Sequence, residues 1–190
     1  MMARSPMSAV LALLAVAAAL PAAATTAVHM SDEDLVRSSD LIVVGRCAEV
    51  QSVWVGRDLV TLATVEVGEQ LKGETRPTVT VVLPGGVDTR RRVPVAVTWP
   101  GAPAMAPGED VLLFLNDYPQ VADGFAVAGF SQGKFSIVEG PQGEPQVARN
   151  LGAVTLRGTA GDQRGGARAE RLDAFLDRVR SMLAGGEVTR

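Results

Sequence analysis

The sequence predicts a mostly β protein, an elaborated Greek-key barrel with a short helix before it and an amphipathic helix after it. Seven or eight short alternating segments, separated by Gly- and Pro-rich turns, occupy about 130 residues, which is typical of a barrel or sandwich. Helical periodicity occurs only before residue 40 and after residue 170. No internal repeat is present. We therefore expect one β domain with helices at its ends.

The first 24 residues have the layout of a cleavable secretory signal peptide. Arg4 supplies the positive charge, Ala9–Leu20 is an unbroken apolar run, and Pro21 breaks the helix before three alanines at 22–24. Twelve apolar residues are too few to span a bilayer core of about 30 Å. We expect a secreted or periplasmic protein that has no transmembrane segment after signal removal.

Composition excludes several classes of site. The chain has 21 acidic and 18 basic residues and a net charge of −3, which argues against a nucleic-acid binder. The only cysteine, Cys47, rules out an internal disulfide, and we expect a buried thiol or, alternatively, an intermolecular disulfide. The only histidine, His29, lies near acids 32–34, but ligands from a chain end and one helical turn seldom converge. No metal ligand set and no cofactor is expected.

A short helix is predicted to begin after Ser31. Ser31 is a good N-cap, and Asp34 stands where the acid of a capping box belongs. Acids in the first turn suit the helix dipole. Leu35 and Val36 would face the core, and the helix should end near Ser39.

The β patterns follow this helix in order. Leu41–Val55 is long enough to need a bend or bulge, for which Gly45 is the candidate. Pro94 lies within the fourth pattern, so that strand should be an edge or irregular, whereas Val111–Leu115 should be buried on both sides. Phe125–Phe130 and Lys134–Val138 would pair with each other around Gln132-Gly133. The remaining expected strands are Leu59–Leu71, Thr78–Leu83, Val93–Trp99 and a weak one within Gln146–Leu156.

The predicted domain boundaries follow from these patterns. Residues 1–24 form the signal peptide, 25–157 the β-barrel domain, 158–169 a flexible Gly-rich linker and 170–186 the C-terminal helix. One apolar stripe runs along that helix, so it should dock on the barrel, with binding of a partner as the alternative. The stripe consists of Leu172, Phe175, Leu176, Val179 and Leu183.

The chain resembles a family of uncharacterised secreted bacterial proteins. Five segments carry this resemblance: SDLIVVGRCAEV, LVTLATVEVGEQLKG, TVTVVLPGG, PGEDVLLFL and VAGFSQGKFSIV. More distantly, the region from Ser39 to Val138 resembles netrin/TIMP-like domains, which implies an OB-fold barrel that binds protein. TIMP-type inhibitors bind the metal of a protease through an N-terminal cysteine. This chain would begin near Thr25 and has only Cys47, so that mechanism is not carried over.

The loop Trp99–Pro107 is the best candidate for partner recognition, because its prolines limit the entropy lost on binding. The densest positive cluster, Arg90-Arg91-Arg92, could dock an acidic partner or a phosphate-rich surface. Core packing of the aromatics and a solvated turn at the arginines are the alternatives. The candidate partner-binding residues are Trp99, Pro100, Met105, Arg90, Arg91 and Arg92.

No catalytic motif is recognisable. The chain has neither a G-x-S-x-G elbow nor a phosphate-binding glycine loop. Ser131 and Ser136 flank Lys134, but Ser136 shares its strand face with Lys134 simply because two residues separate them. The hypothesis is a non-enzymatic β-barrel module that binds an unknown protein or envelope partner. A hydrolase using dispersed carboxylates and a structural envelope component are the alternatives, and no catalytic residue is assigned.

Overall fold

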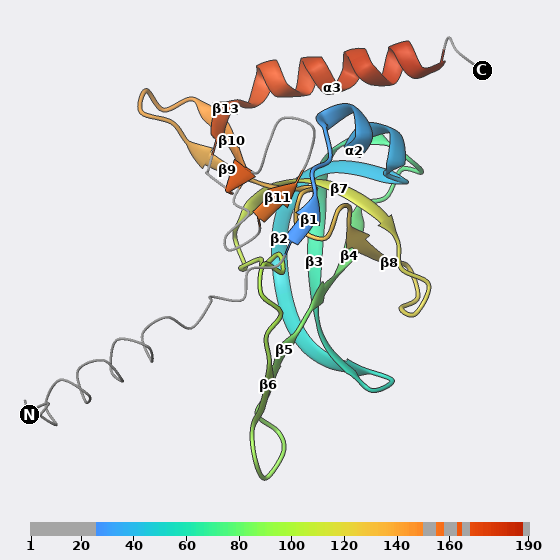
Figure 1. The fold of residues 1–190 in the computed structure, drawn as a ribbon, viewed down its shortest axis with the longest axis vertical. Helices are drawn as coiled ribbons and strands as arrows, with labels where there is room; N and C mark the ends of the chain where they lie inside the picture. Colours follow the sequence, from blue (N-terminus) through green and yellow to red (C-terminus); the bar gives the residue numbers. More distant parts are fainter. Residues whose placement is uncertain (1–25, 150–154, 158–162, 165–167, 188–190) are drawn as a thin grey trace, which may run out of the picture.

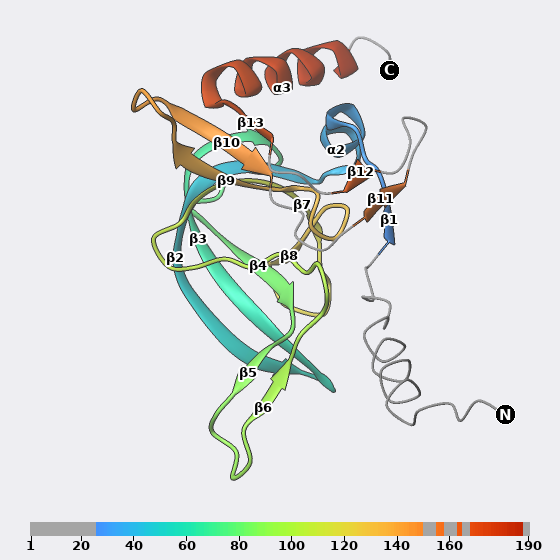
Figure 2. The ribbon, with the colours of Figure 1, turned by 60° about the vertical axis from the view of Figure 1, so that its left-hand side comes forward.

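The computed structural model describes residues 26–149, 155–157, 163–164 and 168–187. The protein is mostly β, and a large mixed sheet dominates it (Figures 1 and 2). The predicted signal peptide, residues 1–24, lies outside the described residues. The elements are β1 (Thr26–Val28), α2 (Asp32–Ser38), β2 (Leu41–Val55), β3 (Asp58–Lys72), β4 (Thr78–Pro84), β5 (Gly86–Asp88), β6 (Val95–Val97), β7 (Asp110–Asp117), β8 (Gly124–Val127), β9 (Lys134–Glu139), β10 (Pro145–Arg149), β11 (Thr155–Arg157), β12 (Gln163–Arg164), β13 (Arg168–Arg171) and α3 (Leu172–Glu187).

The short helix α2 confirms the prediction made from its sequence. Ser31 is the N-cap: its hydroxyl accepts from the Asp34 amide at 3.1 Å, and the Asp34 carboxylate accepts from the Ser31 amide at 3.2 Å. This capping box satisfies two backbone donors that a helix start leaves unpaired. Leu35 and Val36 are buried, and the helix ends at Ser38 with Ser39 as its C-cap.

The large sheet has the strand order β13-β10-β9-β7-β2-β3-β4-β8, and β8 also pairs with β7. Starting from β7, the pairings therefore run through β2, β3, β4 and β8 in turn, and β8 pairs with β7 again. All of these pairs are antiparallel except β4–β8, which is parallel. The register of β2 against β3 shifts between Val44 and Gly45, which confirms the predicted irregularity at Gly45. A Cβ there would clash with the backbone oxygen of Glu66.

Strand β7 is buried on both faces, as the unbroken apolar run Val111–Leu115 predicts. Val111, Leu113 and Leu115 belong to one apolar cluster, here called the inner core, with alternate residues of β2, β3 and β4. Leu112 and Phe114 belong to a second, the outer core, between the sheet and the two helices. Period-two alternation of a strand explains this division between two cores.

Helix α3 docks on the sheet, which confirms the intramolecular role predicted for its apolar stripe. Phe175, Leu176 and Val179 are buried in the outer core, and Leu172 and Leu183 pack against it. Figure 1 shows α3 lying across the end of the molecule beside α2. Neither α2 nor α3, the two helices described, combines the length and apolar character needed to cross a bilayer.

The predicted pairing of the segments around Gln132-Gly133 is wrong. Strands β8 and β9 both run antiparallel to β7, so they point in the same direction and cannot form a hairpin. β8 pairs with the end of β7 and β9 with its beginning, and residues 128–133 loop out between them. The Phe114 carbonyl accepts from the Ala128 amide at 2.9 Å and its amide donates to Gly133 at 2.8 Å, which holds this turn against β7.

The C-terminal boundaries also differ from those predicted. The predicted linker, 158–169, lies partly outside the described residues, but its residues 163–164 belong to β12 and 168–169 to β13. Strand β13 pairs with β10, and α3 begins at Leu172 rather than at 170. The strand Arg168–Arg171 contains three charged residues and one alanine, so it has no apolar alternation to reveal it. The weak strand expected within Gln146–Leu156 corresponds to β10 and β11, with residues 150–154 not described.

Candidate functional site

Strands β5 and β6 form a separate two-stranded sheet that projects from the large one. Figures 1 and 2 show this element extending away from the helices, with the loop between its strands at the far end. We call residues 85–99 the arm. Its strands pair antiparallel, from Gly86 with Val97 to Asp88 with Val95. The strand predicted at Val93–Trp99 is limited to Val95–Val97, consistent with the irregularity expected from Pro94.

The base of the arm is attached to the long hairpin of β2 and β3. The Ser52 hydroxyl accepts from the Val87 amide at 3.0 Å, and the Thr61 hydroxyl donates to the Gly85 carbonyl at 2.9 Å. Gly85 has a φ of +87°, and a Cβ at this position would clash with the Val97 backbone. The polar attachment and the tight glycine turn together fix the direction in which the arm leaves β4.

A buried carboxylate, Asp88, organises the loop of the arm. It accepts from the indole Nε1 of Trp54 at 2.8 Å, from the Arg90 amide at 3.0 Å and from Arg91 Nε at 3.2 Å. The Trp54 hydrogen bond first, and the Arg90 and Arg91 contacts after it, hold the pKa of Asp88 below its ordinary value. The Arg91 guanidinium also lies 4.5 Å from the centre of the Trp54 ring. All three arginines of the cluster are exposed, and Asp88 ties Arg90 and Arg91 to the fold.

Exposed apolar side chains gather on the arm. The described residues include five large hydrophobic side chains that are exposed, and three of them, Val87, Val93 and Trp99, belong to the arm, with exposed fractions of 55, 71 and 56 %. The other two, Val28 and Val138, lie elsewhere on the molecule. Clusters of exposed apolar groups are typical of binding surfaces, whereas single ones are ordinary.

The predicted partner-binding residues divide into two groups. Arg90, Arg91, Arg92, Trp99 and Pro100 are exposed. Met105 requires a correction, because its side chain is buried in the inner core. The loop that follows the arm needs an apolar anchor, and Met105 supplies it. Sequence reasoning missed Asp88, Ser52 and Thr61, which position the arm.

A cavity of about 410 Å³ lies under the loop that follows the arm, and we call it the loop cavity. Its polar side chains form a network: Lys134 Nζ donates to Glu109 Oε1 at 2.6 Å and to Ser136 Oγ at 3.2 Å, and Ser136 Oγ donates to the same Glu109 oxygen at 2.7 Å. Ser131 also lines it. The rest of its wall consists of residues 101–106.

The hydrogen bonds and charges of the loop cavity converge on Glu109. Burial would raise the pKa of Glu109, but hydrogen bonds from Lys134 and Ser136 and the positive charge of Lys134 hold it below its ordinary value. Lys134 forms an ion pair with Glu109 at 2.6 Å, and Ser136 donates to the same carboxylate. Burial first, and Glu109 second, raise the pKa of Cys47, whose thiol is fully buried, as predicted.

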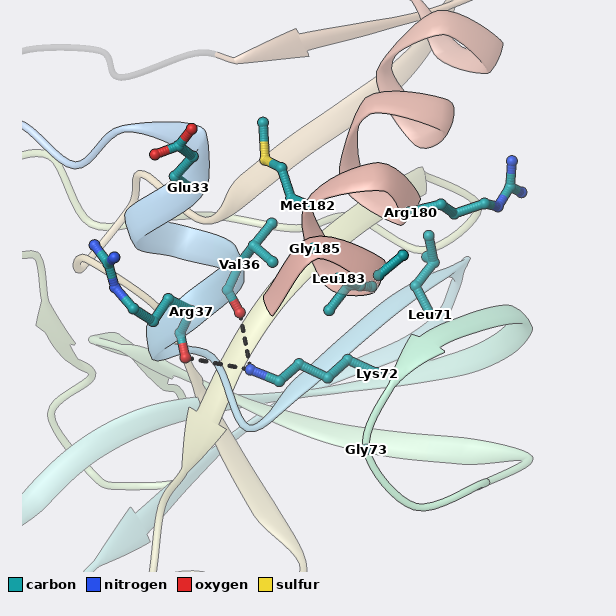
Figure 3. Close-up of a pocket in the computed structure, with 11 residues that line it drawn as sticks. Glu33, Val36, Arg37, Leu71, Lys72, Gly73, Arg180, Met182, Leu183 and Gly185 are labelled. Atoms are coloured by element: carbon teal, nitrogen blue, oxygen red, sulfur yellow. Dashed lines mark hydrogen bonds between the residues drawn. The ribbon is translucent and has the colours of Figure 1, made fainter. Parts of the chain in front are cut away.

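A larger groove of about 1280 Å³ lies between α2, α3 and the end of β3 (Figure 3). Leu71, Met182 and Leu183 line its apolar part. Lys72 Nζ donates to the carbonyls of Val36 and Arg37, at 2.8 and 3.3 Å, and so caps the C-terminal end of α2. This lysine therefore has a structural role in the helix.

The hydrolase alternative requires paired carboxylates, and neither the groove nor the loop cavity has such a pair in its lining. Glu33 is the only carboxylate lining the groove, and Glu109 is the only one lining the loop cavity. Within the described part of the chain, no group of three or more His, Cys, Asp or Glu side chains could hold a metal ion.

No family model, curated protein or solved structure matches this chain. The arm and the loop cavity are the two candidate sites.

Proposed function

We propose that the protein is a non-enzymatic binding module whose arm docks an acidic, partly apolar segment of a protein partner. The observation that carries this proposal is the concentration of exposed apolar side chains and arginines on one element that projects from the sheet. Trp and Arg are enriched among residues that dominate binding energy at interfaces. Exposed apolar surface beside fixed positive charge suits a partner with both characters.

The scaffold of this module is inferred to be an OB-like Greek-key barrel. Support comes from the pairings of β2, β3, β4, β8 and β7, in which every strand has two neighbours and the last pairs with the first. The parallel pair β4–β8 gives the crossover that a simple up-and-down barrel lacks. Such a scaffold would hold the arm at one end of a rigid core.

The charge of the arm identifies the chemistry of the partner. The arm contains three arginines and one acid, Asp88, which is buried, although the whole chain has a net charge of −3. A positive patch on an acidic protein attracts acidic segments and disfavours basic ones. Asp88 and Trp54 hold Arg91 in place before binding, which lowers the entropy lost when a partner docks. The signal peptide predicted at 1–24 would make this partner an extracellular or envelope protein.

A defined peptide tests the proposal. A fluorescently labelled peptide of alternating Glu and Leu should bind the full chain, measured by fluorescence anisotropy. The affinity should fall between about 50 and 300 mM salt, because the arm's charges are exposed and therefore screened. A peptide of alternating Lys and Leu serves as the charge-reversed probe and should not bind.

Variants of matched side chains locate the binding surface. Trp99→Ala and Val93→Ala should each weaken binding of the Glu–Leu peptide, Trp99→Ala by about tenfold or more. Val138→Ala removes an exposed valine on β9, away from the arm, and should leave the affinity unchanged. Equal binding of the two peptides, or equal effects of Val93→Ala and Val138→Ala, would refute the proposal.

A further inference from the structure

Strand β6 of the arm has a free edge. It pairs with β5, and no other strand among the described residues pairs with it. The outer edge of β5, in contrast, is bonded to the β2–β3 hairpin. The Val87 amide donates to the Ser52 hydroxyl, and the Gly85 carbonyl accepts from the Thr61 hydroxyl. An unpaired strand edge carries backbone donors and acceptors that another extended chain can meet.

The register of the arm shows which backbone groups of β6 lie on this edge. Val87 lies directly opposite Ala96. Because the Val87 amide points away from β6 to Ser52, this pair is of the non-hydrogen-bonded kind, in which both residues turn their amide and carbonyl outward. The Ala96 amide and carbonyl therefore face the free edge. Pro94, the next outward residue toward the loop, has no amide, so the edge offers a short pairing site rather than a long template for aggregation.

The two faces of the arm differ in character. Residues directly opposite each other on antiparallel strands share a face, so Val87 and Ala96 lie on one face, and both are exposed. Asp88 lies on the other face, because neighbouring residues of a strand point to opposite sides. Its carboxylate pairs with the guanidinium groups of Arg90 and Arg91, at 3.7 and 3.2 Å. One face is thus apolar, and the other carries the positive charge.

We propose that the partner segment adds to the arm as an extended strand, antiparallel to β6, with its backbone paired to Ala96. An extended chain of alternating acidic and apolar residues presents its carboxylates on one face and its apolar side chains on the other, which matches the two faces of the arm. Antiparallel pairing is slightly more stable per residue than parallel pairing. This inference rests on the proposed function, because it specifies how the acidic, partly apolar segment binds.

A second copy of the chain is the competing occupant of this edge. Two β6 edges could pair with each other around a two-fold axis. Each arm, however, carries three arginines and a single acid, Asp88, whose carboxylate already pairs with two of them. Pairing of two arms would bring like charges together, whereas an acidic segment neutralises them. Charge complementarity therefore favours the partner segment.

Backbone N-methylation of the labelled Glu–Leu peptide tests the pairing. A leucine opposite Ala96 lies on the apolar face, and its amide points to β6, while the glutamate amides point away from the arm. In fluorescence anisotropy with the full chain, methylation of the leucine amides should weaken binding about tenfold or more, and methylation of the glutamate amides by less than about twofold.

The outcomes separate strand addition from the proposed function. Equal effects of the two methylated peptides, or the reverse order, would overturn strand addition while the unmodified peptide still binds. Failure of the unmodified peptide to bind would refute the proposed function, and strand addition with it.

Two variants of one residue locate the pairing on the protein. Ala96→Pro removes an amide that makes no bond to β5 and should abolish peptide binding, whereas Ala96→Ser keeps the amide and should bind like the native chain. Hydrogen exchange of the native chain keeps the test valid if Ala96→Pro does not fold, because the Ala96 amide should become protected when the peptide binds. Undiminished binding by folded Ala96→Pro, or unchanged exchange at Ala96 in the complex, would refute the assignment.

Analytical ultracentrifugation of the free chain tests the competing occupant. The chain should show no self-association that depends on the arm. A dimer that Ala96→Pro abolishes and Ala96→Ser retains would overturn the proposal in favour of a second copy.

Discussion

Replacement of Phe175 by alanine should destabilise the whole protein and not only α3. The Phe175 side chain is 2 % exposed and lies at the centre of the outer core. Its ring centre is 4.9 Å from that of Phe135 and 6.4 Å from that of Phe114, at tilted and edge-to-face angles. The substitution therefore removes the aromatic contacts of α3 with Phe114 of β7 and Phe135 of β9.

The expected loss follows from the contacts of the ring. A buried Phe→Ala change costs about 3–5 kcal/mol, including the cavity that remains. Each aromatic pair contributes about 0.5–1.5 kcal/mol beyond its buried area, and Phe175 takes part in two. The neighbours Leu176 and Val179 are held by their own contacts, which limits collapse into the space. We expect about 4 kcal/mol for Phe175→Ala and about 1–2 kcal/mol for Phe175→Leu, which keeps most of the apolar volume.

Urea unfolding, followed by circular dichroism and by tryptophan fluorescence, measures this loss. Both signals should move together to a lower midpoint, because the outer core joins α3 to the sheet. Ser181→Ala, on the exposed side of α3, is the control and should change the free energy of unfolding by less than about 0.5 kcal/mol. A loss below about 1 kcal/mol for Phe175→Ala, or separate loss of the helical signal alone, would refute the reasoning.

Three further predictions concern the inner core and the loop cavity. Gly45→Ala should cost about 2–3 kcal/mol in urea unfolding, because the new Cβ meets the backbone oxygen of Glu66, while Gly68→Ala, with its nearest atom at 3.8 Å, should cost far less. Equal losses would contradict the steric explanation. Cys47 should not react with a thiol reagent until the protein unfolds, since its thiol is buried and its pKa raised; rapid labelling of the folded chain would contradict this. Because the folded pKa of Glu109 is lowered, its contribution to stability is present above its unfolded pKa of about 4.3 and is lost as the pH falls through the folded value. Glu109→Gln should therefore lose stability at pH 7 and show a weaker acid dependence, and an unchanged pH profile would contradict this ion-pair role.

Features that depend on local contacts could be predicted from the sequence. The capping box of Ser31 and Asp34 lies within one helical turn, so its residues meet wherever the helix packs. The apolar run Val111–Leu115 indicated burial on both sides because no strand with a solvated face could tolerate it. The stripe of α3 indicated docking for the same reason.

Features that depend on register or on distant partners could not be predicted. Strands β8 and β9 are close in sequence, and proximity favoured a hairpin, but both pair with the same edge of β7. Met105 lies in a Pro-rich segment that begins with a tryptophan, and this pattern indicates a recognition loop. Its burial follows from the space between the sheet strands and the loop, which no local pattern encodes.

The loop cavity shows how much of a site a single register determines. Lys134 and Ser136 share a strand face by spacing alone, as the sequence indicates. Pairing of Lys134 with Leu113, and of Ser136 with Val111, turns that face toward the inner core and brings it beside Glu109, the residue before β7. A slip of one residue would turn both side chains to the outer core and leave Glu109 without either donor. The apolar side chains that fix the register of β9 therefore determine the polar network, and only the sheet as a whole could reveal it.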